Sequence, residues 1–206
     1  MNGLKITFCR LTNMYEEKSD REIITEVLNG NDDLFYFLVR RYEKQILNYI
    51  YRLVKQKEEA EDLAQETFTK AFFALHQYNH SYEFSTWLFR IALNVCRDYF
   101  RRRKILFFSL NTPVGEEEET EWGELIEQNS FLDPDGELDN RELRRELEKA
   151  IDNLPLKFKE VIVLRHLEGL SYSDISEITN LPVGTVKTYL HRARKKLQKE
   201  LKEYLD

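Results

Sequence analysis

Apolar side chains recur at helical spacing through most of the chain, in two separate stretches. In the first, residues 19–104, they return every three or four positions. This predicts a short helix after residue 19 and longer helices over residues 33–54, 58–75 and 86–103. No window alternates between apolar and polar residues with period two, so no strand is predicted. The pattern therefore favours an all-α fold.

Capping and turn residues mark where these helices begin and end. Ser19 and Glu22 have the spacing of a capping box, and Gly30 lies where a glycine commonly ends a helix. Residues 77–83 are polar and predict a loop, after which Ser85 is expected to cap the last helix of the stretch. The first stretch is thus expected to form a small four-helix domain.

The second stretch, residues 140–206, is helical by the same criterion. Ser171 and Asp174 predict another cap, which opens a short helix, and residues 180–184 predict a tight turn. A final helix is expected over residues 185–205. Two short helices joined by a few turn residues are typical of a helix-turn-helix, so the chain is expected to hold two small helical domains.

The final helix separates apolar from basic residues. One side carries a stripe that is expected to be buried, made of Val186, Leu190, Ala193, Leu197 and Leu201. The other faces carry Lys187, Thr188, His191, Arg192, Arg194 and Lys195. The N-terminal side chains of such a helix reach base edges in the major groove, and later basic residues meet phosphates. The alternative is an ordinary amphipathic helix with a solvated basic face.

Charge is distributed unevenly along the 206 residues. The net charge is −6, but residues 105–139 hold no Lys or Arg and 11 of the 37 acidic residues. The rest of the chain therefore carries a net charge of +5, from 31 basic and 26 acidic residues. An acidic, flexible linker between two basic domains indicates a nucleic-acid partner, although a solvated tether explains the linker alone.

Composition excludes several classes of protein. The two cysteines, Cys9 and Cys96, make neither a disulfide framework nor a zinc site, and no metal site is predicted. No apolar run is long enough to span a membrane, and the N-terminus has no signal-peptide core. No phosphate-binding loop, nucleophile elbow or HExxH motif is present. We therefore expect a cytoplasmic protein without a catalytic residue, cofactor or small-molecule substrate.

Polar residues in the first domain form further candidate sites. The predicted helix over residues 86–103 carries a polar stripe at steps of four, three and four: Arg90, Asn94, Arg97 and Arg101. Such a stripe suits a nucleic-acid strand, because Arg neutralises phosphate and Asn bonds a base edge. Tyr78 and Tyr82 in the preceding loop are candidates for stacking on unpaired bases, or alternatively pack against the helices. A second polar stripe lies on the predicted helix before the loop and consists of Asp62, Gln65, Glu66 and Thr69. Taken by itself, it indicates only a solvent-exposed helix face.

Three segments together resemble one protein family. LSYSDISEITNLPVGTVKTYLHRARKKL looks like region four of the extracytoplasmic-function sigma factors of bacterial RNA polymerase. DLAQETFTKAFFAL and FSTWLFRIALNVCRDYFRR resemble region two of the same family. The resemblance implies region two over residues 19–104, the acidic linker over 105–139 and region four over 140–206.

The resemblance also implies roles for residues and partners. Residues expected to bind core polymerase are Asp62, Gln65, Glu66 and Thr69. Residues expected at the minus-ten promoter element, including a pocket for a flipped base, are Lys70, Ala74, Tyr78, Asn79, Arg90, Asn94, Arg97 and Arg101. Residues expected at the minus-thirty-five element are Thr185, Lys187, Thr188, His191, Arg192, Arg194 and Lys195. The implied partners are core RNA polymerase, promoter DNA and a membrane-linked anti-sigma factor.

Two other classes remain as alternatives. A free-standing regulator that uses only the helix-turn-helix leaves residues 19–104 without a role, and an enzyme lacks a recognisable catalytic motif. Residues 1–18 are expected to be an N-terminal extension without order. Helix signals begin only at Ser19, so residues 1–13 are expected to be disordered or absent from a product that starts at Met14.

Overall fold

The computed structural model describes residues 17–110 and 141–202, with side chains over 17–103 and 145–202. These two ranges are helical and contain no strand. The predicted linker beyond residue 110 and the predicted N-terminal extension up to residue 16 lie outside the described residues.

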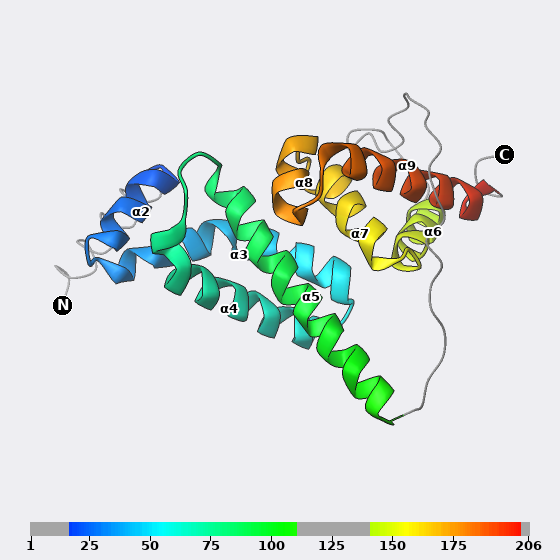
Figure 1. Ribbon diagram of the computed structural model, residues 1–206, viewed down its shortest axis with the longest axis horizontal. Coiled ribbons are helices and arrows are strands. Elements are labelled where there is room, and N and C mark those ends of the chain that lie inside the picture. Colours follow the sequence, from blue (N-terminus) through cyan, green and yellow to red (C-terminus); the bar gives the residue numbers. More distant parts are fainter. Residues whose placement is uncertain (1–16, 111–140, 203–206) are drawn as a thin grey trace.

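In the first domain, one long helix lies across two others (Figure 1). In chain order the elements are α2 (Asp20–Leu28), the 3₁₀ turn η1 (Asp32–Leu34), α3 (Phe35–Val54), α4 (Lys57–Ala74), the 3₁₀ turn η2 (Leu75–Gln77) and α5 (Phe84–Leu110). The longest helix, α5, packs against both α3 and α4, which also pack against each other. The fully buried side chains here include Leu38, Ile46, Tyr49, Ile50, Leu88, Phe89 and Leu93.

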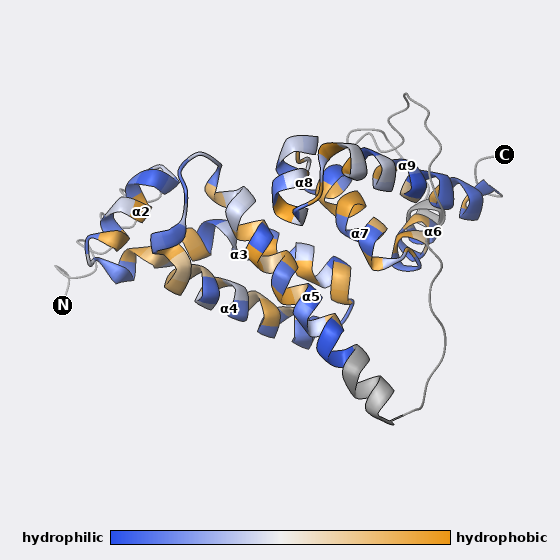
Figure 2. Ribbon diagram, in the orientation of Figure 1, coloured by the Kyte–Doolittle hydropathy of each residue, from blue (hydrophilic) through white to orange (hydrophobic). Residues whose placement is uncertain are grey.

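Helices of the second domain are shorter. They are α6 (Arg141–Asp152), α7 (Leu156–Ile162), the π-helical turn η3 (Val163–Leu167), α8 (Tyr172–Thr179) and α9 (Val183–Glu200). The stripe predicted on the last helix is buried from Val186 to Leu201, and it packs α9 against α6, α7 and α8. Figure 2 shows hydrophilic residues predominating toward the C-terminal end of α9.

Local signals set some of the helix ends. The capping box at Ser19 is confirmed, and so is the one at Ser171, where the hydroxyl accepts from Asp174 N and the Asp174 carboxylate accepts from Ser171 N. Gly30, at φ +101°, has a left-handed conformation that disfavours side chains, as expected for a residue that follows a helix. Local capping chemistry is therefore a sound guide to these boundaries.

Three predicted boundaries are wrong. Helix α5 begins at Phe84, so Ser85 lies inside its first turn and does not cap it; the buried Phe84 ring packs on Trp87 and fixes the start. The same helix continues to Leu110, past the change in charge at residue 105, because no Gly or Pro interrupts it there. Gly184 belongs to the first turn of α9, which begins directly after Pro182.

The two domains contact each other. Helix α8 packs against the middle of α5, and α7 and η3 contact α3 (Figure 1). The buried apolar residues of both domains form one cluster. The sequence pattern indicated two bodies joined by a linker; the structure adds an interface between them.

Candidate nucleic-acid and polymerase interfaces

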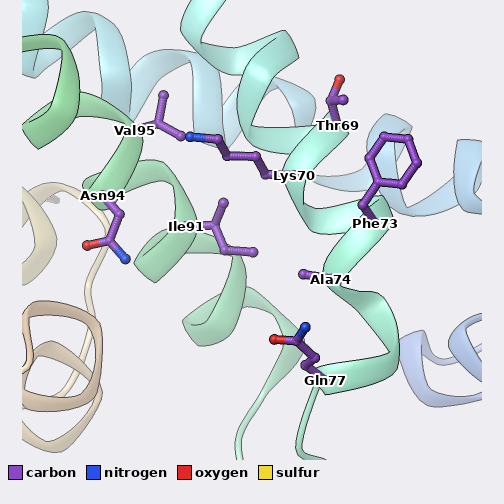
Figure 3. A pocket seen from close by; sticks show the side chains of 8 residues that line it. All are labelled: Thr69, Lys70, Phe73, Ala74, Gln77, Ile91, Asn94 and Val95. Carbon is purple, nitrogen blue, oxygen red and sulfur yellow. The ribbon is translucent and has the colours of Figure 1, made fainter.

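A hollow of about 490 Å³ lies between α4 and α5. It is lined by Thr69, Lys70, Phe73, Ala74, Gln77, Ile91, Asn94 and Val95. Figure 3 shows these side chains on two neighbouring helices, with Lys70 extended toward α5 and Asn94 directed away from Lys70. The hollow thus combines an apolar floor, one ammonium group and two amides.

Some of the residues predicted for a base pocket meet in this hollow and others do not. Lys70, Ala74 and Asn94 line it. Tyr78 is outside the lining: its ring packs 5.4 Å from the ring of Trp87, and its hydroxyl donates to the carbonyl of Tyr82. Partial burial raises the pKa of Tyr78. Asn79 is also outside the lining, and its side-chain oxygen accepts from the backbone N–H and the hydroxyl of Ser81.

Sequence reasoning missed four residues that line the hollow: Phe73, Gln77, Ile91 and Val95. Phe73 is the most exposed apolar residue of the four, at 71%, whereas Phe72 and Ala74 beside it are half-buried. Helical spacing places Phe73 and Gln77 one turn apart on the side of Thr69. Thr69, predicted to bind polymerase, lines the hollow as well.

Charges beside the hollow are paired. Lys70 Nζ lies 2.7 Å from Glu66 Oε1, and Arg102 lies 3.8 Å from the other oxygen of the same carboxylate. Glu66 was predicted to bind polymerase and Lys70 to bind DNA. The ion pair therefore joins the two predicted surfaces on α4.

The remaining residues of the predicted polymerase stripe face solvent. Asp62 and Gln65 are exposed on α4, and the exposed Thr69 donates its hydroxyl to the carbonyl of Gln65 at 2.8 Å. They lie on the face of α4 away from its buried residues, such as Leu63 and Phe68. An exposed polar face of this kind is available for a protein partner.

The four residues of the polar stripe predicted on α5 differ in their exposure to solvent. Arg90, Asn94 and Arg101 are exposed, and Arg101 pairs with Asp98 at 2.9 Å. Arg97 is instead half-buried against the second domain, where its Nε and Nη2 donate to the two carboxylate oxygens of Glu160 at 3.1 and 2.7 Å. These hydrogen bonds raise the pKa of Arg97. Arg97 therefore differs from its neighbours in already having an anionic partner.

Most of the basic residues predicted to bind DNA in the helix-turn-helix are exposed to solvent. Asn180 adopts the left-handed conformation at φ 58° and ends α8, and Pro182 precedes α9. Lys187, at the start of α9, is exposed, and its ammonium lies 5.9 Å from the centre of the Tyr172 ring. Further along α9, the other exposed predicted residues are His191, Arg192 and Lys195.

Three residues of the same predicted surface are less open. Thr185 and Thr188 are half-buried, and the Thr188 hydroxyl donates to the carbonyl of Gly184 at 2.9 Å. Arg194 is half-buried beside His166, and its Nε has no hydrogen-bond partner among the described residues. Burial first, and then the charges of Arg194 and Arg165, lower the pKa of His166. Arg194 thus lies at the edge of the predicted DNA-binding surface of α9, and its side chain packs partly against the second domain near His166.

The described ranges also lack a candidate metal site. Within residues 17–110 and 141–202, no group of three His, Cys, Asp or Glu side chains could hold a metal ion. Within the same residues no helix is long and apolar enough to cross a membrane.

The fold and these surfaces define a class of protein: a two-domain, all-helical protein with a helix-turn-helix whose second helix exposes basic residues. Two family models match it in order. The one described as Sigma-70 region 2 matches residues 38–105, and the one described as Sigma-70, region 4 matches residues 144–197. Each match falls within one of the two helical domains.

Relatives match nearly the whole chain. The ECF RNA polymerase sigma factor SigW of Bacillus subtilis is 36% identical over 180 residues, which are 87% of this chain and 95% of that protein. The RNA polymerase sigma-H factor of Pseudomonas aeruginosa is 33% identical over 93% of this chain and 98% of its own length. The chain therefore belongs to the extracytoplasmic-function sigma factors of the sigma-70 family.

Solved structures share the fold. The sigma factor RpoE in complex with the anti-sigma factor NepR from Bartonella quintana is 25% identical, with a TM-score of 0.62 over 82% of this chain and 96% of that one. CnrH in complex with the cytosolic domain of CnrY is 24% identical, with a TM-score of 0.62 over 90% and 99% of the two chains. The all-α, two-domain architecture is thus common to all three.

Proposed function

We propose that this chain binds core RNA polymerase, directs it to a specific set of promoters and assists in melting the minus-ten element. The observation that carries the proposal is the order of the matches: region two and region four coincide with the two helical domains, and relatives align over nearly the full length. A free-standing regulator has no use for a region-two domain.

The proposed division of labour follows the surfaces. The exposed side of α4, with Asp62, Gln65, Glu66 and Thr69, binds core polymerase. The hollow between α4 and α5 receives an extruded base, with Lys70, Ala74 and Asn94 in contact with it and Phe73 and Gln77 as additional lining. Arg90, Arg97 and Arg101 bind phosphates of the opened strand, and Tyr78 and Asn79 shape the loop beside it.

The second domain is proposed to bind duplex DNA. The first turns of α9 enter the major groove at the minus-thirty-five element, with Lys187, Thr188, His191 and Arg192 toward bases. Thr185, Arg194 and Lys195 bind phosphates, which makes the affinity depend on salt. The exposure of Lys187, His191, Arg192 and Lys195 supports this arrangement.

We further propose that the protein has no catalytic activity of its own and acts in the cytoplasm, where polymerase and promoter DNA are found. Two neighbours of the same fold were solved with protein partners, NepR and the cytosolic domain of CnrY. An anti-sigma factor is accordingly the proposed negative regulator of this chain.

Reconstitution tests the function directly. Purified full-length protein is mixed with core polymerase and a library of genomic promoter fragments, and run-off transcripts are sequenced. We expect a stoichiometric complex with core polymerase and transcripts that share two upstream elements. Sequence-specific DNA binding without any association with core polymerase is the result expected of a free-standing regulator, and it contradicts the proposal.

A further inference from the structure

Two basic side chains lie over the ring of Tyr172, the first residue of α8. The guanidinium carbon of Arg165, on η3, is 4.7 Å from the ring centre, and Lys187 Nζ, on α9, is 5.9 Å from it. A cation within about 6 Å of a ring centre is attracted by the negative potential over the ring face. Tyr172 therefore contacts one residue of the proposed DNA-binding helix and one residue of the segment that precedes α8.

Arg165 holds the ring in a defined place. Its Nη1 donates to the carbonyl of Leu170 at 2.8 Å, in the connection between η3 and α8. Leu170 directly precedes Ser171, whose capping box fixes the first turn of α8. Tyr172 and Leu170 are also half-buried and pack against the core. The ring thus has its position before any DNA is bound.

Lys187 is the kind of residue that gains from such a support. It is exposed near the start of α9, and a lysine carries its charge at the end of a flexible four-carbon stem. Ordering that stem on a base edge costs conformational entropy. A side chain that is already restrained in the free protein loses less of this entropy on binding, and its charge reaches one place instead of many.

A ring restrains an ammonium group differently from a carboxylate. A carboxylate neutralises the charge and accepts its hydrogen bonds, as Glu66 does for Lys70 on α4. An ammonium over a ring keeps its charge, and the N–H groups that point away from the ring remain free to donate. Those donors can bond acceptors in the major groove, such as O6 and N7 of guanine. Lys187 can therefore be held by Tyr172 and bind a base at the same time.

We propose that Tyr172 is a positioning residue for promoter recognition, whose ring, fixed by Arg165, holds the Lys187 ammonium where α9 meets a base edge. The inference rests on the proposed function of α9 at the minus-thirty-five element. It adds that part of the base discrimination of α9 is set from α8, by a side chain that needs no contact with a base.

Positioning by the ring is different from a direct contact between Tyr172 and DNA. A tyrosine hydroxyl at the edge of a DNA-binding surface can donate to a phosphate, which fixes the protein on the duplex without reading its sequence. Tyr172→Phe removes the hydroxyl and keeps the ring, whereas Tyr172→Leu removes the ring and keeps an apolar side chain. This pair of variants separates the two roles.

The place of the Lys187 ammonium is measured first, in the free full-length chain by NMR. Lysine is labelled with carbon-13, and the methylene group beside the Lys187 ammonium is the signal that Lys187→Met removes. We expect its protons to be shifted upfield by the ring current of Tyr172, a shift that Tyr172→Phe keeps and Tyr172→Leu abolishes. Lys157, whose ammonium lies 5.6 Å from the centre of the Phe158 ring on α7, is the reference that none of these variants should move.

Base discrimination is the second readout, with the chain in its complex with core polymerase. A promoter recovered from the transcription library competes with the same promoter altered at the base pair that Lys187→Met identifies as its contact. The ratio of the two affinities is measured on one sample, so a partial loss of folded protein cancels. Tyr172→Leu is expected to lower this ratio by about two- to fivefold, the equivalent of one cation–π contact at an exposed site. Tyr172→Phe is expected to keep the ratio.

Dependence on Lys187 distinguishes positioning from general packing. In the Lys187→Met background, Tyr172→Leu is expected to change the ratio no further, because the group that the ring positions is gone. A further loss in that background overturns the proposal. Lys157→Met is the matched control, because it removes an exposed lysine that lies over another ring of the same domain, and it should leave the ratio unchanged.

Arg165→Gln provides a milder variant if Tyr172→Leu lowers the helix content seen by circular dichroism. It keeps the Tyr172 ring and removes the guanidinium that restrains it. We expect the ratio to fall, by less than in Tyr172→Leu. Any contact of Arg165 with a phosphate affects both promoters alike and cancels.

Three results overturn the proposal in distinguishable ways. A Lys187 signal without the upfield shift, or one that Tyr172→Leu leaves unchanged, shows that the ring does not hold the ammonium, and the proposed function stands. Equal losses in Tyr172→Phe and Tyr172→Leu assign the effect to the hydroxyl. A Lys187→Met protein with unaltered base preference removes Lys187 from the bases, so the proposed role of that residue fails together with its positioning, whereas the complex with core polymerase is unaffected.

Discussion

The two proposed DNA-binding helices differ in how their cations are partnered. On α5, Arg97, Arg101 and Arg102 each pair with a carboxylate. On α9, Lys187 and Arg192 are exposed, and among the described residues neither has an ion pair. Lys187 and Arg192 on α9, like the exposed Arg90 on α5, can therefore meet a phosphate by releasing only solvent ions, whereas the three paired arginines of α5 must exchange one anion for another.

Basic residues of the same type are therefore not equally available to bind DNA on the two helices. An exposed, unpaired cation gains the full benefit of binding a phosphate. A paired cation gains only the difference between its two partners, which is small when both are bound in the same paired manner. The basic residues proposed for the upstream element are thus unpaired within the described part of the chain, whereas most of the arginines proposed for the minus-ten element must first give up a carboxylate partner.

The largest expected effect tests whether the two helices belong to one folding unit. Leu88→Ala in α5 and Leu190→Ala in α9 each remove a fully buried side chain, and each is expected to lower the free energy of unfolding by about 2–5 kcal/mol. Because the domains share a buried cluster, we expect both substitutions to shift one cooperative transition. Urea unfolding followed by circular dichroism and by Trp87 fluorescence, in a Trp122→Phe background, measures this. Two separate transitions would show that the two domains unfold independently.

Lys187→Ala tests whether α9 reads base edges. Lys187 lies in the first turns of α9, where side chains reach base edges, so its loss is expected to cost about 1–3 kcal/mol on the cognate upstream element and to relax discrimination there. Competition binding between cognate and altered duplexes measures the effect. An equal loss on all sequences would place Lys187 on the phosphates.

Arg194→Ala is the matched control for Lys187→Ala on the same helix. Arg194 lies two turns further along, half-buried, and is expected to act only on the backbone. Its loss should weaken binding to all duplexes alike and reduce the salt slope by about one ion. A change in sequence preference contradicts this assignment.

Ser171→Ala tests how much the cap of α8, the helix that packs against α9, contributes to stability. The substitution removes the capping box of α8, which is expected to cost about 1 kcal/mol of stability. Ser173→Ala, at an exposed position of the same helix, serves as the control. Thermal unfolding measures both, and equal effects would show that the cap contributes nothing.

Asn94→Ala has the smallest expected effect and the most specific one. Loss of one side-chain hydrogen bond to an extruded base is expected to cost about 0.5–1.5 kcal/mol in promoter melting, with upstream binding unchanged. Permanganate footprinting with core polymerase measures the melting. Normal melting by this variant removes Asn94 from the base pocket.

Signals carried by neighbouring residues were predictable. The capping boxes at Ser19 and Ser171 and the buried stripe of α9 depend only on residues within a few turns of one another, and the structure confirms them. The start of α5 could not be predicted in this way, because the packing of Phe84 against Tyr42 and Trp87 overrides the capping tendency of Ser85.

Partners distant in the chain were beyond sequence reasoning. Arg97 and Glu160 are 63 residues apart, and neither helical spacing nor charge pattern distinguishes Arg97 from Arg90 or Arg101. The candidate hollow was found in part for the same reason: Lys70 and Asn94 were identified through the family resemblance, whereas Gln77 depends on how α4 and α5 face each other.

Lys55, at the end of α3, has a consequence for engineering. It adopts the left-handed conformation at φ 61°, where glycine is ordinarily favoured, and a stability-guided redesign would replace it with glycine for that reason. The same residue supplies the ammonium that faces Asp152 across the domain interface. A Lys55→Gly protein would therefore relieve its own backbone and lose an ion pair between its domains, so its melting temperature would be a poor guide to how firmly the two domains contact each other.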